Sequence, residues 1–196
     1  MKNDTYSELV APVVVLVVIC MIVTAALALT YGVSNPIIEK NAKKTADATR
    51  TRLLPDADAF TEYKGKLFKE NDKVYVEDVY TSNNNTGIVA TVKTSSFGGA
   101  LTMMVGVDSE GALTGVKVTE HADTPGVGTK DMDPAYLAQY SGLTALTSAD
   151  NIKKETAELA GGGTFEYISG ASVSGQAIHS GVEAALNQFA AMGGAQ

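Results

Sequence analysis

Cysteine, histidine and tryptophan are scarce in this chain of 196 residues, which has one cysteine, two histidines and no tryptophan. The single cysteine, Cys20, lies inside an apolar run, so the chain can form neither an intrachain disulfide nor a cysteine-based metal or iron–sulfur site. His121 and His179 are far apart in the sequence and lack the spacing of a ligand pair. We therefore expect no metal site.

Positive charge is also in short supply, because 15 Lys and Arg stand against 22 Asp and Glu, with a net charge of −7 and a pI near 4.8. Binding to a nucleic-acid backbone requires clustered Lys and Arg, and the sequence offers little beyond the pairs Lys43-Lys44 and Lys153-Lys154. The glycine patterns of Rossmann and P-loop nucleotide sites are missing too. We expect no nucleic-acid partner.

What the chain does have is one long apolar block. Residues 9–29 carry no charge, and at about 1.5 Å per residue they span roughly 31 Å, close to the ~30 Å hydrocarbon core of a bilayer. The block predicts a single transmembrane helix at 9–33, after an N-terminal tail at 1–8. A cleaved signal peptide is the alternative, since Ala26-Leu27-Ala28 resembles a cleavage site. The run exceeds the usual ~7–15 residues of such segments, so we expect it to be retained.

The rest of the sequence predicts an α+β domain. Asn35-Pro36 is typical of an N-cap followed by proline at the first helical position, which predicts a separate juxtamembrane helix and a polar connection within 34–72. Alternating apolar residues then predict a largely antiparallel sheet, with strands at 73–80, 87–94, 100–108 and 113–120. An apolar stripe predicts a final helix over Ser174–Met192 that packs on this sheet. We take 73–196 as the domain.

Two loops stand out chemically. Residues 168–175, ISGASVSG, combine hydroxyls with very small side chains directly before the last helix. A helix N-terminus offers unpaired N–H groups and a positive dipole end, which suits a phosphate. Composition alone favours a simpler interpretation, in which Ser172 or Ser174 is the N-cap. A serine-hydrolase elbow is disfavoured, because Ser174 stands where that motif requires glycine.

The second loop is His121–Lys130, HADTPGVGTK. A proline and two glycines follow a predicted strand, with Thr124 and Lys130 as polar side chains. This pattern suits a ligand site walled by backbone, and it suits an irregular crossover loop equally well.

Taken together, the two loops behind an apolar helix resemble the FMN-binding subunits of Rnf electron-transport complexes and of Na⁺-pumping NADH:quinone reductases. The resemblance rests on Phe97–Gly128 and Glu166–Ile178, and the chain length is closer to that of the Rnf G subunit. It implies FMN joined through its phosphate to the Ser172 hydroxyl by a flavin transferase, with the ring toward the TPGVG loop. Glu166 and Asp123 depart from the family pattern, which has aspartate and glutamate at these positions.

The resemblance further implies a redox subunit of a ferredoxin:NAD oxidoreductase complex coupled to Na⁺ or H⁺ transport, not a catalyst alone. Other membrane subunits of the complex would be its partners, and the flavin domain would lie outside the cytoplasm, although Lys40, Lys43, Lys44 and Arg50 after the apolar block favour the opposite orientation. The rival interpretations are a pseudopilin-like structural protein and a sensor that binds FMN noncovalently. The implied cofactor site comprises Ser172, Ser169, Gly170, Ala171, Ser174, Glu120, Thr124, Pro125, Gly126, Val127, Gly128 and Lys130.

Overall fold

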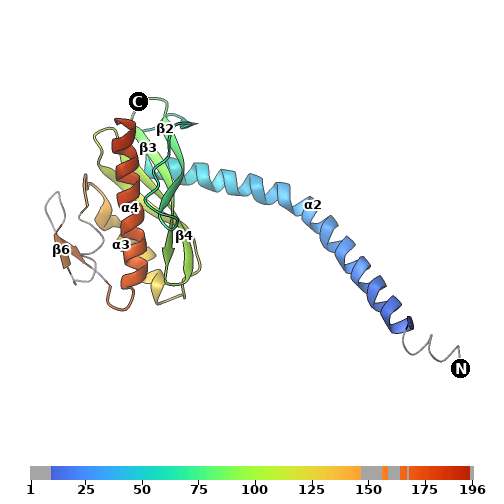
Figure 1. The fold of residues 1–196 in the computed structure, drawn as a ribbon. Coiled ribbons are helices and arrows are strands. Elements are labelled where there is room, and N and C mark those ends of the chain that lie inside the picture. The colour runs from blue at the N-terminus through green and yellow to red at the C-terminus, as the bar shows by residue number, and fades with distance from the viewer. Residues whose placement is uncertain (1–9, 147–155, 159–163, 167, 195–196) are drawn as a thin grey trace, which may run out of the picture. The chain divides into compact units, whose positions relative to one another are not determined.

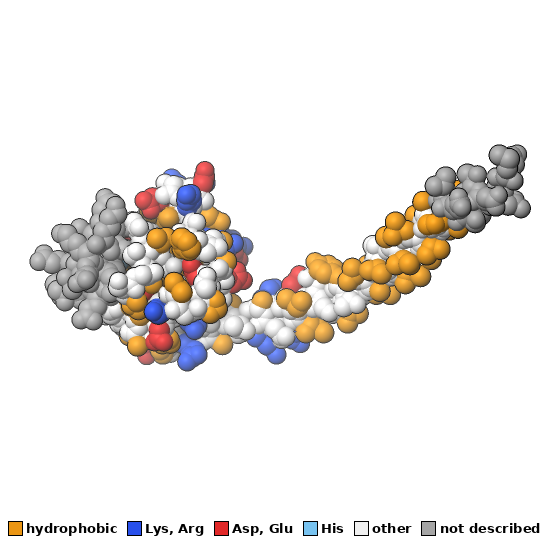
Figure 2. All heavy atoms as spheres, turned by 90° about the horizontal axis from the view of Figure 1, so that it is seen from below, with side chains coloured by type: hydrophobic (Ala, Val, Ile, Leu, Met, Phe, Trp, Pro, Cys, Tyr) orange, Lys and Arg blue, Asp and Glu red, His pale blue; other side chains and the backbone are white. Residues whose placement is uncertain are grey.

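A computed structural model describes residues 10–146, 156–158, 164–166 and 168–194. The chain divides into two compact units, Met1–Asp47 and Ala48–Gln196. The first consists, where it is described, of most of helix α2 (Ala11–Leu53) (Figure 1). Its apolar window has a mean hydropathy of 3.0 and none of it is buried, so α2 is long and apolar enough to cross a membrane. Figure 2 shows hydrophobic side chains along its N-terminal part and Lys and Arg side chains further along.

The predicted helix break at Asn35–Pro36 is wrong, because α2 runs through Pro36 without interruption. The side-chain amide of Asn35 donates to Glu39 Oε1 at 2.8 Å, one turn further along the same helix, and therefore caps nothing. A proline inside a helix removes one backbone hydrogen bond. The strong helix formers that follow, rich in Ala and Lys, continue the helix despite that loss.

The second unit is built on an antiparallel five-stranded sheet in the order β1-β2-β3-β4-β5 (Figure 1). The four strands predicted from alternation are present as β2 (Tyr75–Ser82), β3 (Gly87–Ser96), β4 (Gly99–Asp108) and β5 (Leu113–His121). The additional strand, β1 (Phe60–Glu62), pairs with β2 inside the segment predicted as a polar connection. Three residues are too few to show a period of two, which is why alternation could not detect β1.

Strand β2 contains an irregularity that simple alternation misses. Strict alternation predicts that Val76 and Val79 point to opposite faces, yet both are buried in the same core. The register shifts between Val76 and Asp78, so Glu77 is an extra residue that reverses the alternation.

Helix α4 (Ser172–Met192) covers one face of the sheet. The predicted apolar stripe of α4 belongs to or packs against the core, together with Leu101, Met103, Val105 and Val107 of β4. A side chain at Gly181 would come within 2.6 Å of the Met103 terminal methyl, so glycine allows the helix to approach the sheet closely.

The opposite face receives the last turns of α2. Leu53 lies over Gly106 of β4, where an added Cβ would come within 3.1 Å of the leucine Cβ. The Thr114 hydroxyl donates to the Leu53 carbonyl, and the Arg50 guanidinium carbon lies 3.5 Å from the centre of the Tyr80 ring. Residues 48–53 are therefore part of the folded unit.

Short elements connect β5 to α4: the 3₁₀ helix η2 (Gly128–Met132), helix α3 (Pro134–Leu137), the 3₁₀ helix η3 (Ala138–Tyr140) and the paired strands β6 (Thr156–Glu158) and β7 (Thr164–Glu166). Helix α4 begins two residues earlier than predicted, and its N-cap is Ala171, which makes no side-chain capping bond. Neither Ser172 nor Ser174 is therefore the N-cap that composition favours.

Candidate functional site

The two loops singled out in the sequence meet at the N-terminus of α4. They line a hollow of about 300 Å³, a volume at the lower end of the range for small-molecule sites. Seven of the twelve predicted site residues line it: Thr124, Val127, Gly128, Gly170, Ala171, Ser172 and Ser174. Three further lining residues were not predicted: Phe97, Asp123 and Val173.

The remaining five predicted residues do not line the hollow. Pro125 and Gly126 are exposed at the tip of the loop, where the Gly126 N–H donates to the Thr129 hydroxyl at 2.8 Å. Glu120 and Lys130 are exposed on the two sides of the loop, and Ser169 is exposed in the turn before α4.

The three hydroxyls of residues 168–175 have different environments. Ser174 is 1% exposed and donates to Asp123 Oδ1 at 3.1 Å. Ser169 is exposed but does not line the hollow, whereas Ser172 is exposed and lines it. Of these three hydroxyls, Ser172 is therefore the one that a ligand in the hollow can reach.

Helix geometry adds an electrostatic feature at the same point. Ser172 is the first residue of α4, so its N–H and the two that follow lack acceptors within the helix. Because Ala171 supplies no side-chain cap, these donors are open to a bound anion. Gly170, with φ of +85° and no atom within 4 Å of an added Cβ, leaves the approach clear.

Asp123 joins the parts of the site. This carboxylate is 5% exposed and accepts from the Ser174 hydroxyl, from the Gly98 N–H at 2.9 Å and from the Ser96 hydroxyl. It thereby connects the β3–β4 hairpin, the loop after β5 and the start of α4. The sequence marked Asp123 only as a departure from the family pattern, because its partners are 25 to 51 positions away.

Gly128 fits closely against the same group. An added Cβ would lie 2.7 Å from the Ser174 hydroxyl and 2.8 Å from Asp123 Oδ1. Such distances are shorter than van der Waals contact, so a larger residue would separate the loop from α4.

The rim of the hollow is apolar. Phe97, Val127 and Val173 are 82%, 53% and 48% exposed. Within residues 48–146 and 168–194 they are the exposed large hydrophobic side chains, and all three line this hollow. Exposed apolar groups gathered at one cavity mark a surface that binds a ligand or a partner.

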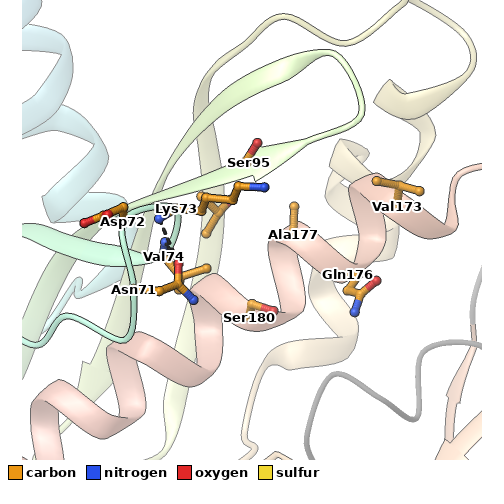
Figure 3. A pocket seen from close by; sticks show the side chains of 10 residues that line it. Asn71, Asp72, Lys73, Val74, Ser95, Val173, Gln176, Ala177 and Ser180 are labelled. Atoms are coloured by element: carbon orange, nitrogen blue, oxygen red, sulfur yellow. Dashed lines mark hydrogen bonds between the residues drawn. The ribbon is translucent and has the colours of Figure 1, made fainter.

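A second hollow, of about 590 Å³, lies along α4 and shares Val173 with the first. In Figure 3, Asn71, Lys73 and Val74 lie across it from Ala177 and Ser180 of α4. The Asn71 side-chain oxygen accepts from the N–H groups of Lys73 and Val74, which fixes this wall as a tight turn. This second hollow is larger than the first, but none of the predicted site residues lines it. We therefore place the candidate site in the first hollow.

Comparison with known proteins gives this geometry a context. Residues 96–187 match the family described as "FMN-binding domain", a range that holds both loops. The protein is therefore a flavoprotein-type chain, with an FMN-binding domain behind a long apolar helix.

Two relatives match nearly the whole chain. The G subunit of the Na⁺-translocating ferredoxin:NAD⁺ oxidoreductase complex of Acetobacterium woodii is 28% identical over 89% of this chain and 88% of its own. The G subunit of the ion-translocating oxidoreductase complex of Methanosarcina acetivorans is 26% identical over 95% and 97%. The crystal structure of Shewanella oneidensis NqrC matches 58% of this chain and 61% of its own, with 24% identity and a TM-score of 0.41. Over nearly its whole length, the chain is therefore similar to these G subunits.

Proposed function

We propose that this chain carries FMN covalently, as a phosphoester of Ser172, and relays electrons in a membrane complex. The observation that supports it most directly is the separation of the three hydroxyls: Ser172 alone among Ser169, Ser172 and Ser174 is both exposed and part of the hollow. The Ser174 hydroxyl donates to Asp123, and Ser169 does not line the hollow.

The attachment is a group transfer from FAD. The Ser172 hydroxyl loses its proton and forms a new P–O bond to the FMN phosphate. The bond between that phosphorus atom and the oxygen that links it to AMP breaks, and AMP leaves with the proton on its phosphate. No side chain lining the hollow besides Asp123 could act as a base, and Asp123 is already held by three donors. We therefore assign this chemistry to a separate flavin transferase.

The residues present fit FMN. The open N–H groups at the head of α4 would hold the phosphate oxygens, Gly170 and Ala171 would let the phosphate approach the backbone, and the apolar rim would contact the ring. When bound, the flavin supplies the redox chemistry, while the protein supplies position and surroundings.

The relatives' names extend the proposal. As a G subunit, the chain would work in an ion-translocating oxidoreductase complex that transfers electrons between ferredoxin and NAD. Its partners would be the other membrane subunits. In this proposal residues 9–33 anchor the chain as a single span in the cell membrane, and the flavin domain at 73–196 lies outside the cytoplasm.

A denaturing gel tests the covalent bond, because noncovalent flavin is lost on it. Expressed with an active flavin transferase, the full chain should give a fluorescent band, and Ser172→Ala should lose it. Ser169→Ala is the matched control, since it removes an exposed hydroxyl of the same loop and should keep the band. Flavin that copurifies with the chain but leaves no band would favour noncovalent binding instead.

A further inference from the structure

A second carboxylate, Asp131, lies buried beside the site without lining the hollow. It belongs to η2 and is 1% exposed. Its Oδ2 lies 2.9 Å from where a Cβ on Gly175 of α4 would stand. Within the described part of the chain, its other oxygen, Oδ1, has no hydrogen-bond partner. A carboxylate in this position is poorly compensated when ionised.

The surroundings of Asp131 bring little positive charge. Burial raises its pKa to about 7, the Asp123 carboxylate adds to this, and a hydrogen bond with the Gly175 backbone opposes both. The hydroxyl of Tyr136 in α3 also lies close, 3.3 Å from where a Cβ on Gly175 would stand. Lys130, its neighbour in the chain, is exposed. His179, one turn along α4, is buried with its ring centre 6.0 Å from that of Tyr140.

Asp131 is connected to the head of α4 in two ways. Gly175 follows Ser172 by three positions, so both lie on one side of the helix, within a turn. Asp123, whose charge acts on Asp131, itself lines the hollow and binds Ser174. A charge added at Ser172 therefore lies within one helical turn of Gly175, the residue that Asp131 contacts, and it disfavours the ionised form of the buried Asp131 carboxyl.

We propose that Asp131 is a proton-binding site coupled to the charge at the head of α4. When negative charge is added at Ser172 or in the hollow, one carboxylate oxygen of Asp131 takes up one proton from solvent. An electron that enters the hollow from the redox donor is thus accompanied by a proton on Asp131. The coupling of proton uptake to an electron rests on the proposed function, whereas the coupling to charge at Ser172 does not.

The coupling can be tested without any cofactor, in the full chain in detergent at low ionic strength. Ser172→Asp places a negative charge at the head of α4, and Ser172→Asn is the neutral control of similar size. Infrared spectroscopy follows the protonated carboxyl band of Asp131, which is identified by its loss in Asp131→Asn. We expect this band to persist to higher pH in Ser172→Asp than in Ser172→Asn. Equal titration midpoints would overturn the proposal.

The coupling of proton uptake to an electron is tested with the flavin-loaded chain. Reduction by dithionite should increase the Asp131 carboxyl band at pH near or above its midpoint, and Asp131→Asn should abolish the increase. Glu110→Gln, which alters an exposed acid on the β4–β5 turn, should retain it. Absence of the increase in chains with a fluorescent gel band would refute redox coupling. Absence of the band itself would refute covalent attachment, and the Ser172 variants would still decide the coupling.

Discussion

Ser174 stabilises the fold through a buried contact, because its hydroxyl donates a hydrogen bond to the Asp123 carboxylate. The same carboxylate also accepts hydrogen bonds from the Gly98 N–H and the Ser96 hydroxyl. Ser174→Ala removes one of these donors from a buried acceptor. We expect the free energy of unfolding to fall by about 1–2 kcal/mol, measured by urea denaturation of the full chain in detergent. Ser172→Ala removes an exposed hydroxyl and should change it by less than about 0.5 kcal/mol. Equal losses in the two variants would contradict the assigned roles.

At Asp131 the prediction concerns pH. Because burial raises the pKa of this carboxyl from 3.8 to about 7 in the folded chain, the folded state holds a proton that the unfolded state releases. This contribution to stability is fully present below about pH 4 and is lost as the pH rises toward 7. Asp131→Asn cannot ionise, so its unfolding free energy relative to wild type should increase by on the order of 2–4 kcal/mol between pH 4 and 8. Parallel urea titrations across this range would show it, and a constant difference would argue against a raised pKa.

At the scale of elements, the β3–β4 hairpin holds the loop after β5 in place. A Cβ on Gly98 would collide with the Ala122 carbonyl, which is backbone and cannot rotate away. Gly98→Ala should therefore weaken the Gly98–Asp123 bond and cost about 1–3 kcal/mol of stability. The fraction of Gly98→Ala chains that acquire flavin, measured by gel fluorescence, should fall together with the stability. Ser95→Ala, an exposed change in the same hairpin, should leave both quantities unaltered.

The elements that sequence could predict are those with a regular pattern. Leu101, Met103, Val105 and Val107 alternate cleanly, and they form the core side of β4 as expected. The bulge at Glu77 and the strand at Phe60–Glu62 depend on pairing with distant strands, which no local pattern encodes. The prediction of a helix start at Pro36 failed for a related reason. The preference of proline for the first turn of a helix is weaker than the tendency of the surrounding residues to form one continuous helix.

The residues of the site also divide into those with a local sequence signal and those without one. Small residues and hydroxyls drew attention to Gly170 and Ser172 because their unusual composition is local. Phe97, Val173 and Asp131 carry no such signal, since an isolated apolar or acidic residue is ordinary until its neighbours in space are known. Their positions at the rim and beneath α4 follow from the fold.

For the whole molecule, the compact unit beginning at Ala48 predicts where the chain can be cut. A fragment of residues 48–196 should stay folded and soluble without detergent, because it keeps Leu53 and Leu54, which are 8% and 2% exposed. A fragment of residues 56–196 loses both leucines and Arg50, and uncovers one face of the sheet. We expect it to be less stable by on the order of 3 kcal/mol or more. Denaturant midpoints of the two fragments compare them, and equal midpoints would show that the end of α2 contributes nothing.

The hollow draws on residues 97, 123, 124, 127, 128 and 170–174, which lie up to 77 positions apart in the chain. It therefore comes into being only once the sheet, the loop and α4 have assembled. A peptide copied from residues 168–175 would contain Ser172 and none of the opposing wall. In the proposed attachment to Ser172, the modifying enzyme would receive a finished domain as its substrate, and the phosphoester would afterwards mark the copies of the chain that had folded correctly.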